Sequence, residues 1–321
     1  MDSALRRIRI AVSTGRLRGL PAEPGTPEIT LLGAGESYVA WRIGSGDQAQ
    51  VLRVPRRSPH EMPRSMMAEF ETLRRVPPEF GTSAIALETG TDNPLGIPYM
   101  VTTHVSGRAL RATDWNPRLA TALAHQIARL HEAFATSPAP SAVFVPSAGE
   151  QGEELLTWWG RHHPETLTDP RVTALLPAWR RELTRLAPAF EAVPIHPLIH
   201  GDVVVTNVIL GPDGVPRLID FEWSGPGDRA KDLALIGGRV IGGPWYLPMT
   251  PDDVAAFVTE YSRYSRHAGA IDPQQLLARR DAYELLDRMG NLLYCLSRPG
   301  EARYGMWADE IARNLTDRLA D

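Results

Sequence analysis

The sequence predicts an α+β protein in which an antiparallel sheet comes first and a mainly helical region follows. Short runs rich in β-branched and aromatic residues at 28–33, 38–43 and 50–54 are separated by glycine-containing turns, as in successive hairpins. Beyond residue 116, apolar residues recur at helical spacing over long stretches. A chain of 321 residues is long enough for about two domains and a substantial core.

Composition and charge narrow the class of protein. Hydrophobic residues make up 43% and charged residues 22%, which is ordinary for a soluble globular protein. A formal net charge of −4 offers no electrostatic case for nucleic acid or an anionic membrane as a partner. The N-terminus lacks the apolar segment of a signal peptide, and Cys295 has no second cysteine with which to form a disulfide. We expect a cytoplasmic protein, and the oligomeric state stays open.

The order of elements follows from periodicity and turn residues. We expect a leading helix, three strands, a further helix, a buried strand that runs into a linker, and then helices separated by loops. Residues 136–150 are predicted to form a loop, and the hairpin described next precedes the last three helices. The predicted helices cover residues 3–20, 63–76, 116–134, 153–163, 169–190, 251–265, 273–297 and 301–319, and the buried strand begins at 97.

The stretch 198–223, LIHGDVVVTNVILGPDGVPRLIDFEW, contains the residues that indicate chemistry. Two short apolar runs flank the turn residues 211–214, so a β-hairpin is predicted. It would bring Asn207, before its first strand, close to Asp220, after its second. An amide oxygen beside a carboxylate suits Mg²⁺, which takes few protein ligands. Asp202 would then accept a proton from an attacking hydroxyl, as phosphoryl transfer requires. The alternative is a plain hairpin in which these side chains cap turns.

HGDxxxxN at 200–207, followed by IDFE at 219–222, resembles the aminoglycoside phosphotransferase and choline kinase superfamily, small-molecule relatives of the protein kinases. The resemblance implies a bilobal protein-kinase-like fold, with a nucleotide-binding lobe at 1–105 and a catalytic and acceptor-binding lobe at 106–321. It implies that Asp202 is catalytic and that Asn207 and Asp220 bind the metal.

Two further residues take structural roles by the same resemblance. Asp232 matches the aspartate that braces the catalytic loop through backbone hydrogen bonds, and His200 is expected to be buried and structural, because Asp202 already fills the role of base. One departure from the family is the apolar filler Val203-Val204-Val205-Thr206, where more polar residues are usual. This filler leaves the spacing between Asp202 and Asn207 intact.

The turn at 32–37 occupies the position at which the family covers the nucleotide. Gly33, Gly35 and Ser37 would let backbone N–H groups approach phosphate oxygens closely. On the residues alone, an ordinary hairpin is the alternative. These three residues are therefore candidates for nucleotide binding.

The third strand carries Arg53 where kinases usually place a lysine that holds the α- and β-phosphates. Arginine also binds phosphate and pairs with carboxylates, but it is longer and planar. The alternative is an exposed arginine on an edge strand. We expect its partner to be Glu69, which lies four residues before Leu73 on the inward face of the following helix, rather than Glu71.

The segment 97–107 resembles the family's hinge, so main-chain groups around Thr103 and Val105 are expected to bind the nucleotide base. Backbone recognition leaves little trace in side chains, and ATP and GTP both stay open as donors.

His125 and His131 have no acidic partner at metal-ligand spacing, so we expect them to pack or to lie at the surface. We expect three tryptophans either to line a pocket or to pack between helices: Trp158, Trp159 and Trp179. We expect the aromatic loop 242–249 either to form one wall of the acceptor site or to pack against the rest of the protein.

We therefore predict an ATP- or GTP-dependent O-phosphotransferase that uses Mg²⁺ and acts on a hydroxylated small molecule. Acidic and basic residues are nearly balanced between 277 and 321, which favours an acceptor less cationic than an aminoglycoside. The expected acceptor is an antibiotic of the macrolide, nucleoside or aminoglycoside class, inactivated to confer resistance. The alternatives are a housekeeping kinase of choline, homoserine or a sugar, and a non-enzymatic nucleotide-binding protein of kinase fold.

Overall fold

The computed structural model describes residues 2–21, 28–58, 61–137, 144–265 and 272–320. The chain divides into two compact units, one of residues up to Arg108 together with Ile209–Ser224, the other of Ala109–Val208 and Gly225–Asp321. The expected division at residue 105 treated each lobe as continuous. The hairpin segment instead groups with the first unit, where Leu218 forms a bridge with Gly81 and accepts a hydrogen bond from the Thr82 amide at 3.3 Å.

The first unit contains a five-stranded antiparallel sheet in the order β1-β2-β3-β5-β4. The three strands that open the chain match the predicted hairpins, and the fifth strand matches the predicted buried strand. Sequence reasoning missed β4, which forms one edge of the sheet. The strands are β1 (Ile29–Ala34), β2 (Tyr38–Ile43), β3 (Gln50–Pro55), β4 (Ala84–Glu88) and β5 (Tyr99–Thr103).

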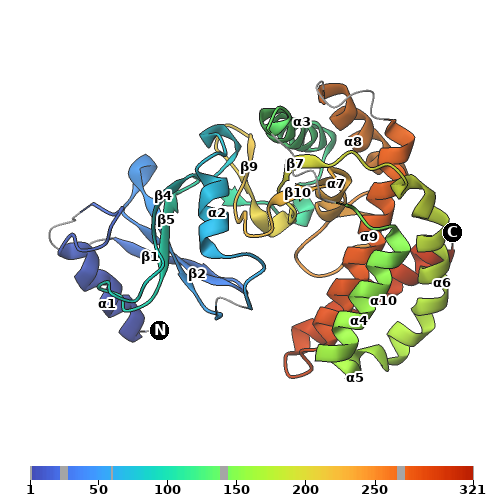
Figure 1. The fold of residues 1–321 in the computed structure, drawn as a ribbon, viewed down its shortest axis with the longest axis horizontal. Coiled ribbons are helices and arrows are strands. Elements are labelled where there is room, and N and C mark those ends of the chain that lie inside the picture. Colours follow the sequence, from blue (N-terminus) through green and yellow to red (C-terminus); the bar gives the residue numbers. More distant parts are fainter. Residues whose placement is uncertain (1, 22–27, 59–60, 138–143, 266–271, 321) are drawn as a thin grey trace. The chain divides into compact units, whose positions relative to one another are not determined.

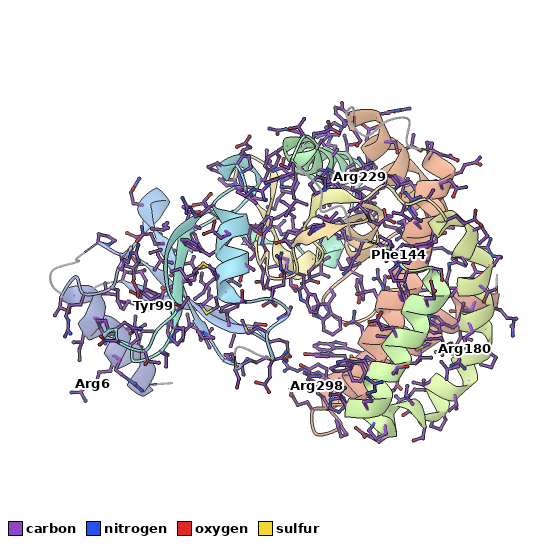
Figure 2. The ribbon with its side chains drawn as sticks, in the orientation of Figure 1. Arg6, Tyr99, Phe144, Arg180, Arg229 and Arg298 are labelled. Carbon is purple, nitrogen blue, oxygen red and sulfur yellow. The ribbon has the colours of Figure 1, made fainter. Side chains whose placement is uncertain are left out.

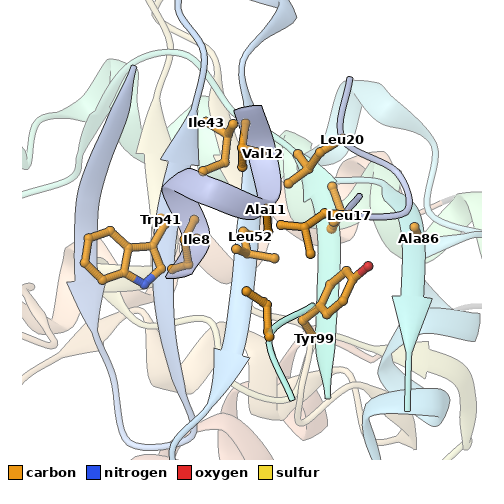
Figure 3. Packing of buried hydrophobic residues seen from close by; sticks show 12 residues of the cluster. Ile8, Ala11, Val12, Leu17, Leu20, Trp41, Ile43, Leu52, Ala86 and Tyr99 are labelled. Carbon is orange, nitrogen blue, oxygen red and sulfur yellow. The ribbon is translucent and has the colours of Figure 1, made fainter. Parts of the chain in front are cut away.

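The two helices of this unit, α1 (Asp2–Ser13) and α2 (Met66–Leu73), cover opposite faces of the sheet (Figure 1). α1 was predicted to reach residue 20. It ends earlier because Gly15 takes a positive φ of 60°, which breaks the helix. Its inner face joins a core of buried residues from the helix, the segment after it and the sheet, which Figure 3 shows from close by: Ile8, Ala11, Val12, Leu17, Leu20, Trp41, Ile43, Leu52, Ala86, Leu95, Tyr99 and Val101.

Alternation along β3 separates this core from the polar face of the sheet. Leu52 is fully buried under α1, so its neighbour Arg53 points to the opposite face, towards α2. Leu52 therefore joins the core on one side of the strand, and Arg53 presents its guanidinium group on the other side.

The hairpin segment forms as predicted, with β8 (Val208–Leu210) and β9 (Pro216–Leu218) on either side of the turn. The Gly211 amide donates to the Val215 carbonyl at 3.0 Å, and Asp213 Oδ1 accepts from the Val215 amide at 3.1 Å. β8 also pairs with the short strand β6 (Arg108–Ala109), and the chain passes from one unit to the other within both of these strands.

The second unit is mainly helical, and α9 (Pro273–Leu296) lies against several other helices, as Figure 1 shows. The three predicted C-terminal helices are present. The remaining elements are α3 (Pro117–Phe134), α4 (Ala148–His162), α5 (Pro164–Leu167), α6 (Pro170–Leu186), β7 (His196–Ile199), β10 (Gly225–Gly227), α7 (Ala230–Leu235), β11 (Gly237–Gly238), β12 (Leu247–Pro248), α8 (Pro251–Tyr264) and α10 (Ala302–Ala320).

The start of α4 differs from the prediction, which placed residues 148–150 in a loop and began the helix at 153. Ser147 and Glu150 form a capping box, in which each side chain bonds to the other residue's backbone amide. This signal, Ser-x-x-Glu, was present in the sequence and was overlooked. Residues 138–143 of the predicted loop lie outside the described residues.

None of the helices in the described part of the chain combines the length and the apolar character needed to cross a membrane.

Candidate active site

The candidate catalytic loop, residues 200–207, follows β7 and carries Asp202 and Asn207 together. The Asn207 side-chain amide donates to Asp202 Oδ2 at 2.8 Å and to the Asp202 carbonyl at 3.1 Å. Asn207 lies in a short 3₁₀ turn (Val205–Asn207) that leads directly into β8. Because the amide nitrogen of Asn207 is directed at Asp202, its amide oxygen is the atom suited to a cation.

Asp232, on α7, holds the start of this loop. Its carboxylate accepts hydrogen bonds from the His200 amide at 2.8 Å, the Gly201 amide at 2.7 Å and His131 Nε2 at 2.9 Å. Burial opposes ionisation, yet these hydrogen bonds and the charge of His131 lower the pKa of Asp232 below its usual range. The bracing by Asp232 and the burial of His200 are both as expected.

The two helix histidines both have distant acidic partners that sequence spacing did not reveal. His131 is fully buried and bonds Asp232 and, at 2.7 Å, the Tyr261 hydroxyl. His125 Nε2 lies 3.0 Å from Glu260 Oε1. Both contacts link α3 to other elements of the second unit, so the two histidines pack, as expected.

In the first unit, Arg53 bonds two carboxylates. Its Nη1 bonds Glu69 Oε1 in a very short contact, and its Nη2 lies 2.5 Å from Asp220 Oδ1. Only 7% of Arg53 is exposed, which rules out the alternative of an exposed edge-strand arginine. Burial alone disfavours the charged guanidinium, but Glu69 and Asp220 outweigh it and raise the pKa of Arg53 above its usual value.

The choice of Glu69 over Glu71 holds in the structure. Glu69 is 1% exposed, whereas Glu71 lies at the surface beside Arg74. Tyr38 completes the buried group: its hydroxyl donates to Glu69 Oε2 at 3.0 Å, and its ring lies under the Arg53 guanidinium, 4.1 Å from centroid to Cζ. Tyr38 thereby contacts both members of the Arg53–Glu69 pair.

Asp220 has a strained backbone. Its φ of 65° is the one positive value at a non-glycine position among the described residues.

Two residues on, Glu222 is 8% exposed and its Oε2 atom is buried without a hydrogen-bond partner. Burial, and next the negative charge of Asp220, raise the pKa of Glu222 to about 7. A divalent cation would satisfy both groups, because each offers a hard oxygen donor.

The glycine-containing turn adopts a hairpin in which the Gly35 amide donates to the Tyr38 carbonyl at 2.9 Å. A Cβ atom added at Gly33 would meet nothing within 4 Å, so the protein's own packing does not require glycine there. Ser37 is buried and bonds Glu222 with its side chain. The turn thus leaves open space at Gly33 and directs Ser37 towards the carboxylates rather than towards solvent.

The two residues expected to bind the nucleotide base, Thr103 and Val105, lie at and beyond the end of β5. The Thr103 amide donates to the Ser83 carbonyl at 2.9 Å, and the Thr103 carbonyl accepts from the Thr82 hydroxyl at 2.9 Å. The two residues just before β4 therefore already engage both main-chain groups of Thr103. Val105 lies two residues beyond the end of β5 and is half-buried.

Across the described residues, no group of three or more His, Cys, Asp or Glu side chains is assembled to hold a metal ion. This finding is compatible with Mg²⁺, which keeps several waters and takes one or two carboxylates with phosphate oxygens. Within the first unit, Asp220 and Glu222 offer carboxylate oxygens of the kind that Mg²⁺ prefers.

Residues 28–273 match the phosphotransferase enzyme family. The chain belongs to this family. It is also 30% identical over 204 residues to the viomycin phosphotransferase of Streptomyces vinaceus. The aligned residues cover 56% of this chain and 67% of that protein. These matches confirm that the protein is a small-molecule phosphotransferase, as the motif residues implied.

Solved structures confirm the bilobal kinase-like fold of this phosphotransferase. The GDP complex of aminoglycoside 2′-phosphotransferase-IIIa superposes with a TM-score of 0.64 at 17% identity, over 100% of this chain and 99% of that one. A choline kinase from Streptococcus pneumoniae gives a TM-score of 0.64 at 15% identity, over 99% of both chains. At such identities the likeness concerns the fold alone.

Sequence reasoning gave no role to two residues of the candidate site. Tyr38 contacts Arg53 and Glu69, and Glu222 adds a second carboxylate after Asp220. Tyr246, in the aromatic loop that was expected to wall the acceptor site or to pack, is buried near Asp202. Glu222 was visible as the last residue of IDFE. Tyr38 had no signal, because a tyrosine at the start of a strand is common and its partner Glu69 is 31 residues away.

Proposed function

We propose that this phosphotransferase transfers the γ-phosphate of ATP or GTP to a hydroxyl group of a small molecule. The observation that supports this most directly is the hydrogen bond between Asn207 and Asp202 in a loop braced by Asp232. An aspartate fixed in this way can orient an attacking hydroxyl and accept its proton. The alternative of a non-enzymatic nucleotide-binding protein is disfavoured, because each catalytic position carries a competent residue.

Asp202 is the proposed catalytic base. The Asn207 amide holds one carboxylate oxygen, Oδ2, and so fixes the rotamer of the side chain. Its other oxygen is then the one to receive the proton of the acceptor hydroxyl. Most of the rate enhancement would come from this positioning rather than from covalent chemistry, because the phosphoryl group passes through a loose transition state.

Arg53 is the proposed contact to the nucleotide phosphates, in place of the usual lysine. Glu69 and Tyr38 keep its guanidinium in position, and a planar cation can bind phosphate oxygens with two parallel hydrogen bonds. The turn of Gly33, Gly35 and Ser37 is the proposed cover for the phosphates, although the Gly35 amide itself already donates to the Tyr38 carbonyl. The nucleotide base would bond to Val105, since both main-chain groups of Thr103 are engaged.

Asn207 and Asp220 are the proposed ligands of Mg²⁺, and Glu222 is a candidate third. A bound Mg²⁺ would neutralise charge on the nucleotide phosphates. Asp220 directs Oδ1 at Arg53, so Oδ2 is the oxygen suited to the cation. The buried, unpartnered Oε2 of Glu222 and the strained backbone of Asp220 both suit such a role.

The proposed acceptor is a hydroxylated antibiotic, which the enzyme would inactivate. Four carboxylates on or directly before α9 and α10 pair with arginines rather than standing ready for the ammonium groups of a polycation, which favours a less cationic acceptor. The pairs are Asp281 with Arg280 (2.9 Å), Asp287 with Arg288 (2.6 Å), Glu301 with Arg303 (2.6 Å) and Asp309 with Arg171 (2.5 Å). The similarity to a viomycin phosphotransferase supports the antibiotic class over choline, homoserine or a sugar.

A phosphorylation screen tests this proposal. The purified protein is incubated with Mg²⁺ and either ATP or GTP, together with viomycin, erythromycin, streptomycin, choline or homoserine. A mass gain of one phosphoryl group on an antibiotic supports the proposal, and a gain on choline or homoserine alone supports the housekeeping kinase instead. Susceptibility of cells that express the gene then decides whether the activity confers resistance. No phosphorylated product and no nucleotide binding would contradict the proposal.

A further inference from the structure

The catalytic loop has a second backbone anchor, at its far end from Asp232. The Val205 amide donates to the Trp245 carbonyl at 2.8 Å. Val203, Val204 and Val205 are all buried, so the apolar filler of this loop is a packing surface. Asp202 thus lies between two fixed points, the amides of residues 200 and 201 held by Asp232 and the amide of Val205 held by Trp245.

The carbonyl of Trp245 is in turn positioned by its neighbour Tyr246. The Tyr246 hydroxyl donates to Asp287 Oδ2 at 2.7 Å and also contacts the Asn291 amide, and both partners lie on α9. The Arg288 guanidinium covers the ring at 3.4 Å from its centroid. Burial, and next the charge of Asp287, raise the pKa of Tyr246 well above its usual value, so the hydroxyl stays protonated and donates.

The side chain of Trp245 belongs to a different environment from its carbonyl. Its indole ring lies 5.2 Å from that of Trp307 and 6.2 Å from that of Tyr294, and Tyr304 extends the same cluster. Trp245, Tyr294 and Trp307 are each only half-buried, so the cluster presents ring surface to solvent. Arg298, labelled in Figure 2, stacks on Tyr294 at 3.5 Å.

The backbone before Trp245 is shaped for this ring. Gly243 has a φ of 66°, and a Cβ atom added there would lie 2.4 Å from the indole. Its amide donates to Glu310 Oε2 on α10 at 3.2 Å. An alanine at this position would displace the ring, so the glycine is needed for the position that the indole occupies.

We propose that Trp245 links recognition of the acceptor to the catalytic loop. Its indole and the neighbouring rings contact a planar or apolar part of the acceptor, and its carbonyl, positioned by Tyr246, fixes the loop that carries Asp202. This inference rests on the proposed phosphotransfer to a small-molecule hydroxyl and names the kind of acceptor surface that is recognised. Trp245 is a specificity-determining residue in this scheme, and Tyr246 is a positioning residue.

Substitutions at Trp245 and Tyr246 separate these roles, because changing a side chain leaves the carbonyl of residue 245 in place. With an acceptor that the wild-type enzyme phosphorylates, W245A raises the KM for that acceptor about tenfold or more, and W245F, which keeps an aromatic ring, raises it less. Y246F removes the hydrogen bond to Asp287 and lowers kcat about tenfold while the acceptor KM changes little. Y283F, at another buried tyrosine of the same unit, is the matched control and changes neither constant.

Hydrogen exchange provides a readout that needs no acceptor. In Y246F, exchange at residues 203–205 speeds up about tenfold, because the bond from the Val205 amide to residue 245 opens more often, whereas Y283F leaves it unchanged. Unchanged exchange in Y246F would overturn the positioning role. For the recognition role, viomycin and erythromycin are titrated against the wild type and W245F by tryptophan fluorescence.

The outcomes for the proposed function and for this inference are distinguishable. If the wild type phosphorylates none of the screened compounds, the proposed function fails, while the exchange result still decides the role of Tyr246. Equal acceptor KM values in W245A, W245F and the wild type would overturn the recognition role. So would a fluorescence response to a bound compound that is the same with and without Trp245.

Discussion

Arg53 reaches Asp220 across 167 residues of sequence, with Nη2 at 2.5 Å from Oδ1, while its other nitrogen bonds Glu69. A single guanidinium thereby joins β3, α2 and the segment after the hairpin within the first unit. The planar fork of arginine suits this arrangement, because it offers separate nitrogens to two carboxylates. The substitution of arginine for the usual lysine is therefore part of a coherent local structure.

Removal of this guanidinium is expected to destabilise the fold and weaken nucleotide binding. R53A leaves Glu69 buried without its partner, so the free energy of unfolding falls by about 3–5 kcal/mol. R53K retains the charge but bonds fewer oxygens, and it costs less. Denaturant unfolding and the KM for nucleotide measure the two effects. R57A, at an exposed pair with Glu36, is the control and changes stability by less than about 1 kcal/mol. A stable, fully active R53A enzyme would contradict the role assigned to Arg53.

Loss of the Asp202 carboxylate is expected to stop transfer and spare nucleotide binding. D202N keeps the shape of the side chain but cannot accept a proton, so kcat falls by about 10²- to 10⁴-fold. Nucleotide affinity, measured by titration calorimetry, stays within about threefold of the wild type because the proposed phosphate contacts lie elsewhere. Near-normal turnover in D202N would refute the assignment of the base.

Asp220 is expected to be required for metal-dependent nucleotide binding. D220N tolerates the positive φ of this position, since asparagine also adopts it, but loses the charge. The affinity for nucleotide in the presence of Mg²⁺ should fall at least about tenfold, while the affinity in EDTA changes little. D213N, in the turn of the same hairpin, serves as the control. Equal effects of Mg²⁺ on D220N and the wild type would exclude Asp220 as a ligand.

Acid is expected to destabilise the protein in part through His196. Burial, and next the charge of His131, lower the pKa of His196 to about 4 from its ordinary value of 6.5. Between these values the unfolded chain binds a proton that the folded chain does not, so stability is full above about pH 6.5 and is lost as pH falls towards 4. The expected loss is about 1–3 kcal/mol.

Thermal or denaturant unfolding between pH 4 and 7 measures this dependence. H196Q removes the titrating group and so flattens the slope, whatever it does to the absolute stability. H162Q, at an exposed position on α4, keeps the slope of the wild type. An unchanged slope in H196Q would show that other groups account for the loss of stability in acid.

Local sequence patterns predicted the elements well where the signal is itself local. The β-branched and aromatic run at 38–43, between glycine-containing turns, and the helical spacing at 116–134 predicted β2 and α3 to within a residue, because turn residues and helical periodicity act over short stretches of chain. The same reasoning missed β4 and began α4 too late, since an edge strand and a capping box are short signals that long-period patterns obscure.

The sequence by itself determined the family, the α+β fold and the positions of Asp202, Asn207 and Asp220, because these depend on spacing along the chain. Only the tertiary structure decided which further groups meet: Arg53 with Asp220 as well as the expected Glu69, Glu222 beside Asp220, and the Val205 amide with the Trp245 carbonyl. Contacts between residues far apart in sequence depend on how whole elements pack, and no short pattern encodes that packing. Beyond Asp232 and Glu69, which the sequence indicated, the residues that support the candidate catalytic groups were therefore visible only once the chain was folded.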